Sequence, residues 1–194
     1  TVGLHPHRAE QWSAAVRAEL AGLLGDPRAV AVGECGLDFF RERAPHAVQL
    51  QAFEGQAELA LEAGKPLVIH SREAAADTLD VLRGFPGRVI LHCFALPDDV
   101  DEVIERGWWA SFAGNVTYPS AVPLQEAARR IPVERLLVET DSPYLAPVPN
   151  RGKPCRPAMV LDTLRFIAEL RGDDPDELGR AVVASADAAF ALPA

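Results

Sequence analysis

Short apolar runs that end in polar residues recur along this chain, and longer segments with helical periodicity follow them. The apolar part of each run spans about four to six residues, is rich in Val, Ile and Leu, and shows little strict alternation. Strands that are buried on both faces have this pattern. We therefore predict strands within the runs at residues 1–7, 29–38, 66–72, 88–94, 108–114 and 136–141.

The segments between and after these runs predict helices. Residues 46–63 carry apolar side chains at spacings of three and four, and Gly64 follows as a natural C-terminal cap. Further helices are predicted at residues 73–83, 97–106, 157–172 and 174–190. Alternating strands and helices indicate an α/β fold with a parallel sheet.

Two α/β architectures fit this alternation, the doubly wound open sheet and the (β/α)₈ TIM barrel. A doubly wound fold normally carries a phosphate-binding glycine loop after its first strand, and the sequence contains neither GxGxxG nor GxxxxGK[ST]. In a TIM barrel, the reactive side chains are spread over the C-terminal ends of many strands. Because the polar residues here follow that arrangement, we predict a barrel, incomplete at about six of eight βα units, in one domain over residues 1–194.

The composition predicts a soluble protein of the cytoplasm. Hydrophobic residues make up 48% of the 194 residues, but no apolar run approaches the roughly 20 residues that span a bilayer. The start, TVGLHPH, has neither a basic flank nor a long apolar segment, so we expect no secretory signal. Cys35, Cys93 and Cys155 are far apart in the sequence, which argues against a disulfide framework.

The formal charge of −9 and the pI of about 5.0 argue against nonspecific binding of duplex DNA through a basic surface. They leave a nucleic acid substrate open. A pocket that holds divalent cations inverts the local field whatever the net charge is.

Histidines and carboxylates gather at the ends of the predicted strands. Buried imidazoles and carboxylates cost several kcal/mol unless they are paired or bound to a metal. If these strand ends meet at one mouth of a barrel, mixed His and carboxylate ligands favour Zn²⁺, Mn²⁺ or Mg²⁺. The side chains concerned are His5, His7, Glu34, His70, Arg72, His92, Glu139 and Asp141.

Each of these residues also has a simpler interpretation. A single strand-end histidine can be a satisfied core or surface residue, and Glu139 with Asp141 can cap the next helix. Strand alternation puts Glu139 and Asp141 on one face. By the same alternation, Cys35 and Cys93 should point to the outer layer as packing residues.

Several motifs make the chain similar to the TatD-related deoxyribonucleases. GLHPH, GECGLDFFRE, QLQAFEGQAELA, KPLVIHSREA, HCF, SFAGNVTYPSA, VETDSPYLAP and RGK occur in that family's order and spacing. The resemblance implies a (β/α)₈ barrel of the metal-dependent hydrolase type that acts as a nuclease on DNA. It also leaves RNA and aminoacyl-tRNA ends open, because some relatives are described as acting on them.

The resemblance implies roles for individual residues. Glu34 would bridge two divalent cations (Mg²⁺, Mn²⁺ or Zn²⁺), and His70 and His92 would ligate the second of them. Asp141 would ligate the first and act as the general base toward the attacking water, so Glu34 and Asp141 are the implied catalytic residues. The side chains implied to hold phosphate oxygens are His5, His7, Arg72, Arg151 and Lys153.

The sequence also departs from the family pattern. The family opens with Asp-x-His-x-His, which is absent here, so we expect an N-terminally truncated chain that binds the second metal better than the first. Ala95 and Leu96 follow Phe94 where the family reads HCFSG. Cys155 and Arg156 replace an Asn and a Glu after RGK.

Three functions remain open at this point. The first is a metal-dependent phosphodiesterase of DNA that prefers 3′ ends or single strands to duplex, without a membrane or an obligate protein partner. The second is a hydrolase of the same superfamily for a small ester, amide or lactone, which is disfavoured because neither Lys65 nor Lys153 ends a strand. The third is an inactive scaffold. It is disfavoured because such a protein would be expected to lose Glu34, His70, His92 or Asp141, and all four are present.

Overall fold

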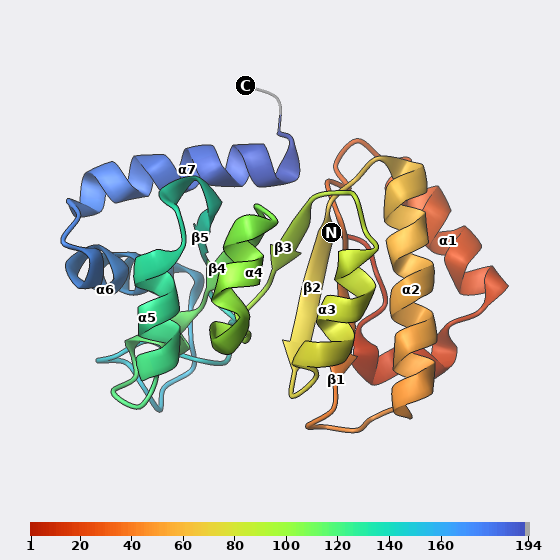
Figure 1. Cartoon of the computed structure of the whole chain (residues 1–194), viewed down its shortest axis with the longest axis horizontal. Helices are drawn as coiled ribbons and strands as arrows, with labels where there is room; N and C mark the ends of the chain where they lie inside the picture. The colour runs from red at the N-terminus through yellow and green to blue at the C-terminus, as the bar shows by residue number, and fades with distance from the viewer. Residues whose placement is uncertain (193–194) are drawn as a thin grey trace. The chain divides into compact units, whose positions relative to one another are not determined.

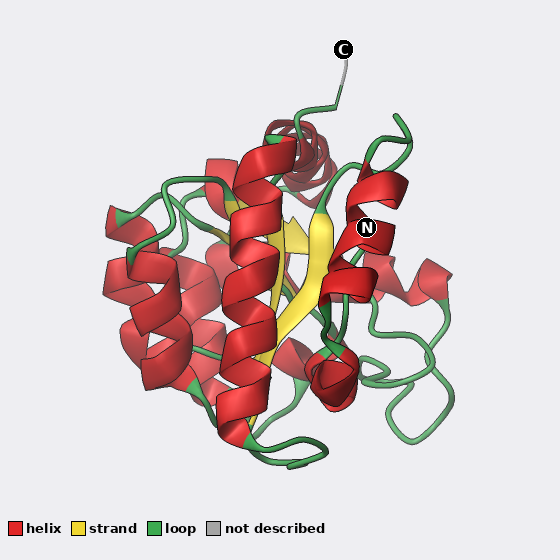
Figure 2. Ribbon diagram, turned by 90° about the vertical axis from the view of Figure 1, so that its right-hand side faces the viewer, coloured by secondary structure: helices red, strands yellow, loops and turns green. Residues whose placement is uncertain are grey.

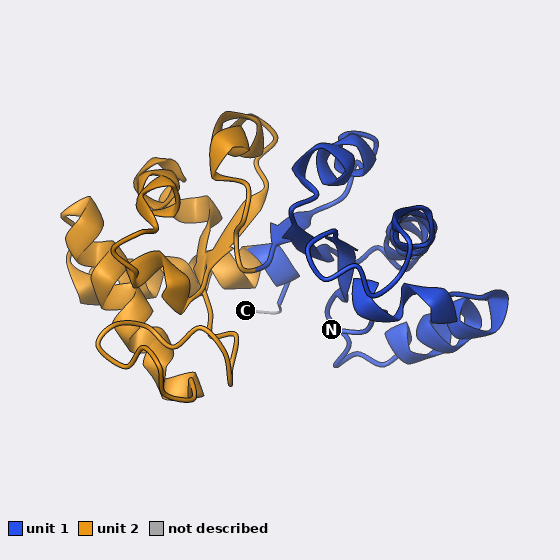
Figure 3. Cartoon of the chain, turned by 90° about the horizontal axis from the view of Figure 1, so that it is seen from below, with its two compact units in different colours: residues 1–92, 189–193 blue, residues 93–188, 194 orange. Residues whose placement is uncertain are grey.

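The computed structural model describes residues 1–192, which divide into two compact units (Figures 1 and 3). Unit 1 holds residues 1–92 and a short piece that begins at Ala189, and unit 2 holds residues 93–188. Helices and strands alternate along the chain in both units, with helices red and strands yellow in Figure 2. No helix within residues 1–192 is both long enough and apolar enough to cross a membrane.

Unit 1 is built on parallel strands. β1 (Val32–Asp38) pairs with β2 (Leu67–Arg72), and β2 pairs with β3 (Val89–Leu91). The helices within residues 1–92 are the 3₁₀-helix Pro6–Gln11, α1 (Ala14–Leu24), α2 (His46–Ala63) and α3 (Ala75–Arg83).

Unit 2 repeats the arrangement with a shorter parallel pair. β4 (Trp109–Phe112) pairs with β5 (Leu136–Val138), with Ala110 opposite Leu136. The α-helices are α4 (Val100–Glu105), α5 (Val122–Arg130), α6 (Val160–Arg171) and α7 (Pro175–Phe190), which begins in this unit. Short 3₁₀-helices span Pro97–Asp99, Gly114–Thr117, Val133–Arg135 and Pro157–Met159.

Buried strands and a helix that packs along them form the core of unit 1. Leu37 of β1 and Ile69 of β2 are fully buried, as the runs of apolar residues predict. α2 packs along β1 and contributes the fully buried Phe53. It has the bounds predicted from its periodicity, and Gly64 ends it in the left-handed conformation with φ 64°.

The first apolar run does not form the predicted strand. Within residues 1–7 the only strand-like pairing is an isolated parallel bridge from Val2 to Val32. Pro6 has no N–H to give to a sheet and starts the 3₁₀-helix Pro6–Gln11. The N–H of His7 then donates to Nδ1 of His5 at 3.1 Å, within a local turn.

Candidate metal centre

The pairing of β1 with β2 brings Glu34 and His70 together. Gly36 lies opposite His70 in the parallel register, which shifts between Gly33 and Cys35. A Cβ atom at Gly36 would lie 2.1 Å from the carbonyl oxygen of His70, and the φ of Gly36 is +127°. Only glycine therefore allows this close approach of the two strands.

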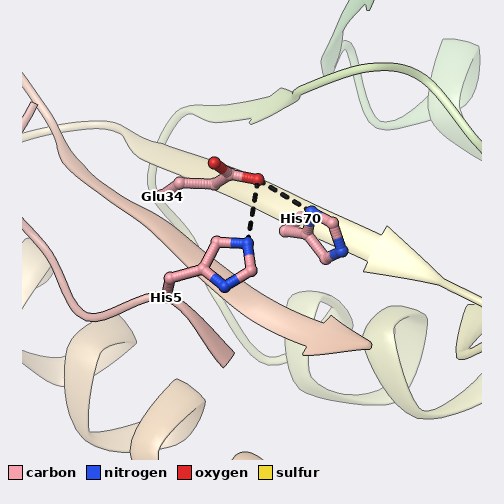
Figure 4. Close-up of side chains that lie close together, drawn as sticks. All are labelled: His5, Glu34 and His70. Atoms are coloured by element: carbon pink, nitrogen blue, oxygen red, sulfur yellow. Dashed lines mark hydrogen bonds and ion pairs between the residues drawn. The ribbon is translucent and has the colours of Figure 1, made fainter. Parts of the chain in front are cut away.

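One carboxylate oxygen of Glu34 lies at the centre of three imidazoles. Oε1 is 2.7 Å from Nδ1 of His70 and 3.6 Å from Nε2 of both His5 and His92. Figure 4 shows His5 and His70 turned toward this oxygen. One ligand atom each from His5, Glu34 and His70 lies within 4.8 Å of the other two. This set of nitrogen and oxygen donors suits Zn²⁺ or Mn²⁺.

Two of these groups are in the protonation state that metal binding requires. Burial raises the pKa of Glu34, but the His70 hydrogen bond and the nearby His92 and His5 outweigh burial and lower it overall. Burial lowers the pKa of His5 from 6.5 to about 4. At neutral pH, Glu34 is thus a carboxylate and His5 a neutral imidazole, as metal ligands must be.

Asp38 is a second carboxylate behind this cluster and was not among the predicted site residues. Its side chain is fully buried. Oδ2 lies 2.7 Å from Nε2 of His7 and 3.2 Å from Nε2 of His70, while Oδ1 accepts the Arg41 N–H at 2.8 Å. Strand alternation from Glu34 could have found it, because positions 34 and 38 share a face.

The imidazole of His70 therefore lies between two carboxylates, Glu34 at Nδ1 and Asp38 at Nε2. A neutral imidazole has one N–H, so it can donate to only one of them. A cation bound at Nδ1 and shared with Glu34 would leave Nε2–H to donate to Asp38. Carboxylate–histidine–metal arrangements of this kind are common in metal sites. The donor set thus fits a bound divalent cation.

Helix α2 holds the backbone on both sides of the cluster through two buried glutamines. Gln49 accepts the Asp38 N–H at 2.8 Å and donates to the Asp38 carbonyl oxygen at 3.2 Å. Gln56 accepts the Leu4 N–H at 2.7 Å and donates to the Leu4 carbonyl oxygen at 3.1 Å. The seven-residue spacing puts both glutamines on one helix face. α2 thereby fixes the backbone at Asp38 and next to His5.

The structure separates the two histidines that the sequence analysis grouped as phosphate-binding. His5 lies in the cluster with Glu34 and His70, whereas His7 contacts Asp38. The third such residue in unit 1, Arg72, is exposed, and its Cζ lies 3.9 Å from the centroid of the Phe40 ring.

The remaining predicted site residues belong to unit 2. Asp141 is partly buried, and its carbonyl oxygen accepts the Tyr144 N–H at 2.7 Å. Arg151 and Lys153 are exposed, and the Arg151 guanidinium lies over the Tyr118 ring at 4.2 Å. The roles of Asp141, Arg151 and Lys153 stay predictions.

Glu139 has a structural role in unit 2. Its Oε1 accepts the Cys93 N–H at 2.9 Å, and its Oε2 accepts the Ser111 hydroxyl at 2.5 Å. The Glu139 carboxylate therefore links the residue after β5 to Ser111 of β4 and to the backbone at Cys93.

The low pKa of His5 predicts a pH-dependent stability in the absence of metal. The unfolded chain binds this proton near pH 6.5 and the folded chain only near pH 4, so the folded state should lose roughly 1–2 kcal/mol between pH 7 and pH 5. His5→Gln should reduce this loss in urea titrations at the two pH values. His46→Gln, at an exposed histidine, is the matched control. An unchanged pH dependence in His5→Gln would contradict the assignment.

The family assignment rests on a match over nearly the whole chain. The model of the TatD-related DNase family matches residues 1–191. The chain belongs to this family. A TatD-family relative from Mycobacterium tuberculosis, described as an uncharacterized metal-dependent hydrolase, is 44% identical over 98% of this chain and 75% of its own length. The TatD protein of Erwinia billingiae, described as a 3′-5′ ssDNA/RNA exonuclease, is 38% identical over 100% of this chain and 78% of its own.

A solved structure in the TatD family has the same fold. The crystal structure of the TatD homologue YjjV from Escherichia coli K12 superposes with a TM-score of 0.91 and 27% sequence identity. The match covers 100% of this chain and 76% of the YjjV chain. It confirms the predicted α/β fold of the TatD barrel hydrolases. The chain spans about three quarters of the length of each of the three relatives.

Proposed function

We propose that this protein is a metal-dependent hydrolase that cleaves phosphodiester bonds of DNA at 3′ ends or in single strands. The observation that carries the proposal is the shared Glu34 oxygen, with imidazole nitrogens of His5, His70 and His92 at 2.7–3.6 Å. The relative from Erwinia billingiae, described as an exonuclease of single-stranded DNA and RNA, supports the choice of substrate.

In this proposal, Glu34, His70 and His92 would hold one divalent cation, and Glu34 would also serve as a ligand of a second. Such cations, when bound, polarise a phosphoryl oxygen and lower the pKa of water toward neutrality. Glu34 is suited to the shared position because its pKa lies below the ordinary range, so it is ionised at neutral pH. Asp38 keeps the ring of His70 in orientation through its contact with Nε2.

Asp141 would ligate the other cation and act as the general base. Its carboxylate would take a proton from the attacking water as the new P–O bond forms and the bond to the leaving oxygen breaks. His7, Arg72, Arg151 and Lys153 would hold phosphate oxygens. His5, whose imidazole is neutral at neutral pH, would donate an N–H to a phosphate oxygen. Positive side chains are needed for this step because the chain as a whole carries a charge of −9.

Three further expectations remain proposals. One barrel domain over residues 1–194 is supported by the family model, which matches residues 1–191. A cytoplasmic location is supported by Cys35, Cys93 and Cys155, none of which is in a disulfide. We also propose that the enzyme acts without an obligate protein partner.

The function can be tested with a labelled single strand and a duplex of the same sequence. Purified protein should shorten the single strand in the presence of Mg²⁺, Mn²⁺ or Zn²⁺ and should cleave the duplex more slowly. Addition of EDTA should stop the cleavage. His92→Ala should lower the rate with each metal, whereas the exposed surface variant Arg83→Ala should not. If neither substrate is cleaved with any of the three metals, the proposed function is wrong. If His92→Ala is as active as the wild type, His92 is not a metal ligand.

A further inference from the structure

Phe40 is an aromatic side chain in an exposed position directly after the strand of the candidate metal centre. It follows Asp38 by two residues and has 49% of its surface exposed. Its neighbour Phe39 is instead half-buried and stacks on His46, with ring centroids 3.6 Å apart. Large exposed apolar side chains are common singly on protein surfaces, so exposure of Phe40 alone assigns no role.

Two guanidinium groups lie at the Phe40 ring. The Cζ atom of Arg72 is 3.9 Å from the ring centroid and that of Arg41 is 5.5 Å away. Arg72 ends β2, two residues after His70, and lies opposite Asp38 in the β1–β2 register. Both positive side chains therefore come from the strand ends of the candidate metal centre.

Within residues 1–192, neither guanidinium forms an ion pair with a carboxylate. Among the described residues of this acidic chain, the ion pairs do not include Arg41 or Arg72. The exposed Arg17 and Arg28, by comparison, pair with Glu62 and Asp26 at 2.6–2.7 Å. Proteins bind single-stranded nucleic acids with this combination of an aromatic ring and unpaired positive charge. The base stacks on the ring, and the phosphate contacts the cation.

We propose that Phe40, with Arg72 and Arg41, forms a subsite that stacks one nucleobase of a single-stranded substrate beside the metal centre. The inference rests on the proposed function and adds the residue that would recognise a base. The six residues from Glu34 to Phe40 span at most about 20 Å of extended chain, which an oligonucleotide of a few nucleotides can bridge. Since every base has a π face, the subsite would select single strands over duplex without reading sequence.

The test compares Phe40 variants on oligothymidylate whose phosphorothioate linkages resist hydrolysis, with affinity measured by fluorescence anisotropy. Phe40→Ala should weaken binding about tenfold, which lies toward the lower end of the range for loss of one base–aromatic stack. Phe40→Trp should bind at least as well as wild type, and Phe40→Leu should bind like Phe40→Ala. Leu61→Ala, which removes an apolar side chain 46% exposed on α2, is the matched control and should bind like wild type.

A second arm removes the base instead of the ring. Oligonucleotides with one abasic position, scanned along the strand, should contain a position that weakens wild-type binding about tenfold but Phe40→Ala binding less than twofold. Arg72→Gln should reduce the slope of log affinity against log salt by about one. If the wild type binds and Phe40→Ala binds equally well, the subsite is wrong but the proposed function stands. The same holds if the losses from Phe40→Ala and from the abasic site add at every position. Failure of the wild type to bind or cleave any strand would instead reject the proposed function.

Discussion

Glu34→Gln should lower phosphodiester hydrolysis by at least about a thousandfold, which corresponds to about 4 kcal/mol of lost transition-state stabilisation. The substitution keeps the size of the side chain but removes the charge from the oxygen that lies 2.7–3.6 Å from three imidazoles. Because a neutral amide is a weak ligand for a divalent cation, metal affinity should fall together with kcat/KM. Calorimetric titration with Mn²⁺ and steady-state kinetics on a single strand measure the two losses.

The matched control for this prediction is Glu62→Gln on α2. Glu62 is 59% exposed and pairs with Arg17 at the surface, at 2.6 Å. This variant should retain wild-type metal affinity and kcat/KM, since surface ion pairs contribute little. Metal affinity within twofold of wild type in Glu34→Gln would contradict the role of Glu34, even if the activity fell.

Asp38→Ala should lower the free energy of unfolding by about 2–4 kcal/mol. The substitution removes a fully buried carboxylate and leaves His7, His70 and the Arg41 N–H without their acceptor. Metal affinity should fall at the same time, by about 10–100-fold, because His70 loses the contact that orients it. Urea unfolding without metal separates the first effect from the second.

The stability effect of Asp38 should also depend on pH. Burial raises the pKa of Asp38, but the Arg41 N–H and the His7 contact outweigh burial, so the pKa lies below its ordinary value of 3.8. The contribution of the Asp38 carboxylate to stability is therefore complete above its ordinary pKa and is lost as the pH falls through the lower pKa of the folded state. The difference in stability between wild type and Asp38→Asn should shrink at the most acidic pH that the fold tolerates.

Asp80→Ala is the control for the stability prediction. Asp80 is 70% exposed and pairs with Arg83 three residues later on α3, so its loss should cost less than about 1 kcal/mol. An Asp38→Ala variant as stable as Asp80→Ala, with unchanged metal affinity, would show that the buried carboxylate holds neither the fold nor His70.

Much of the fold could be predicted because local pattern and tertiary burial agree. The apolar residues at 29–38 and 66–72 form β1 and β2, and the helical periodicity of 46–63 gives α2 with its glycine cap. The run at 1–7 failed because its apolar residues are too few to outweigh Pro6, which has no N–H for a sheet. A short apolar run specifies a strand only where the backbone can complete the ladder.

The candidate site was predictable where a polar residue directly follows an apolar run in the sequence. Glu34 and His70 could be named because each follows an apolar run, and these two runs form β1 and β2, which pair in parallel. The different contacts of His5 and His7 could not be predicted, because they depend on the turn at Pro6 and on the buried Gln56 that holds Leu4. Asp38 was not predicted because its role is that of a buried acceptor for His7 and His70, which depends on how these side chains pack.

The most direct test of the metal centre is anomalous diffraction at the zinc edge from crystals soaked in Zn²⁺. We expect a peak at about 2.0–2.2 Å from both Glu34 Oε1 and a ring nitrogen of His70, and no peak there in His70→Ala crystals. Zinc peaks confined to other residues, with Glu34 and His70 still in direct contact at saturating Zn²⁺, would contradict a metal centre at Glu34.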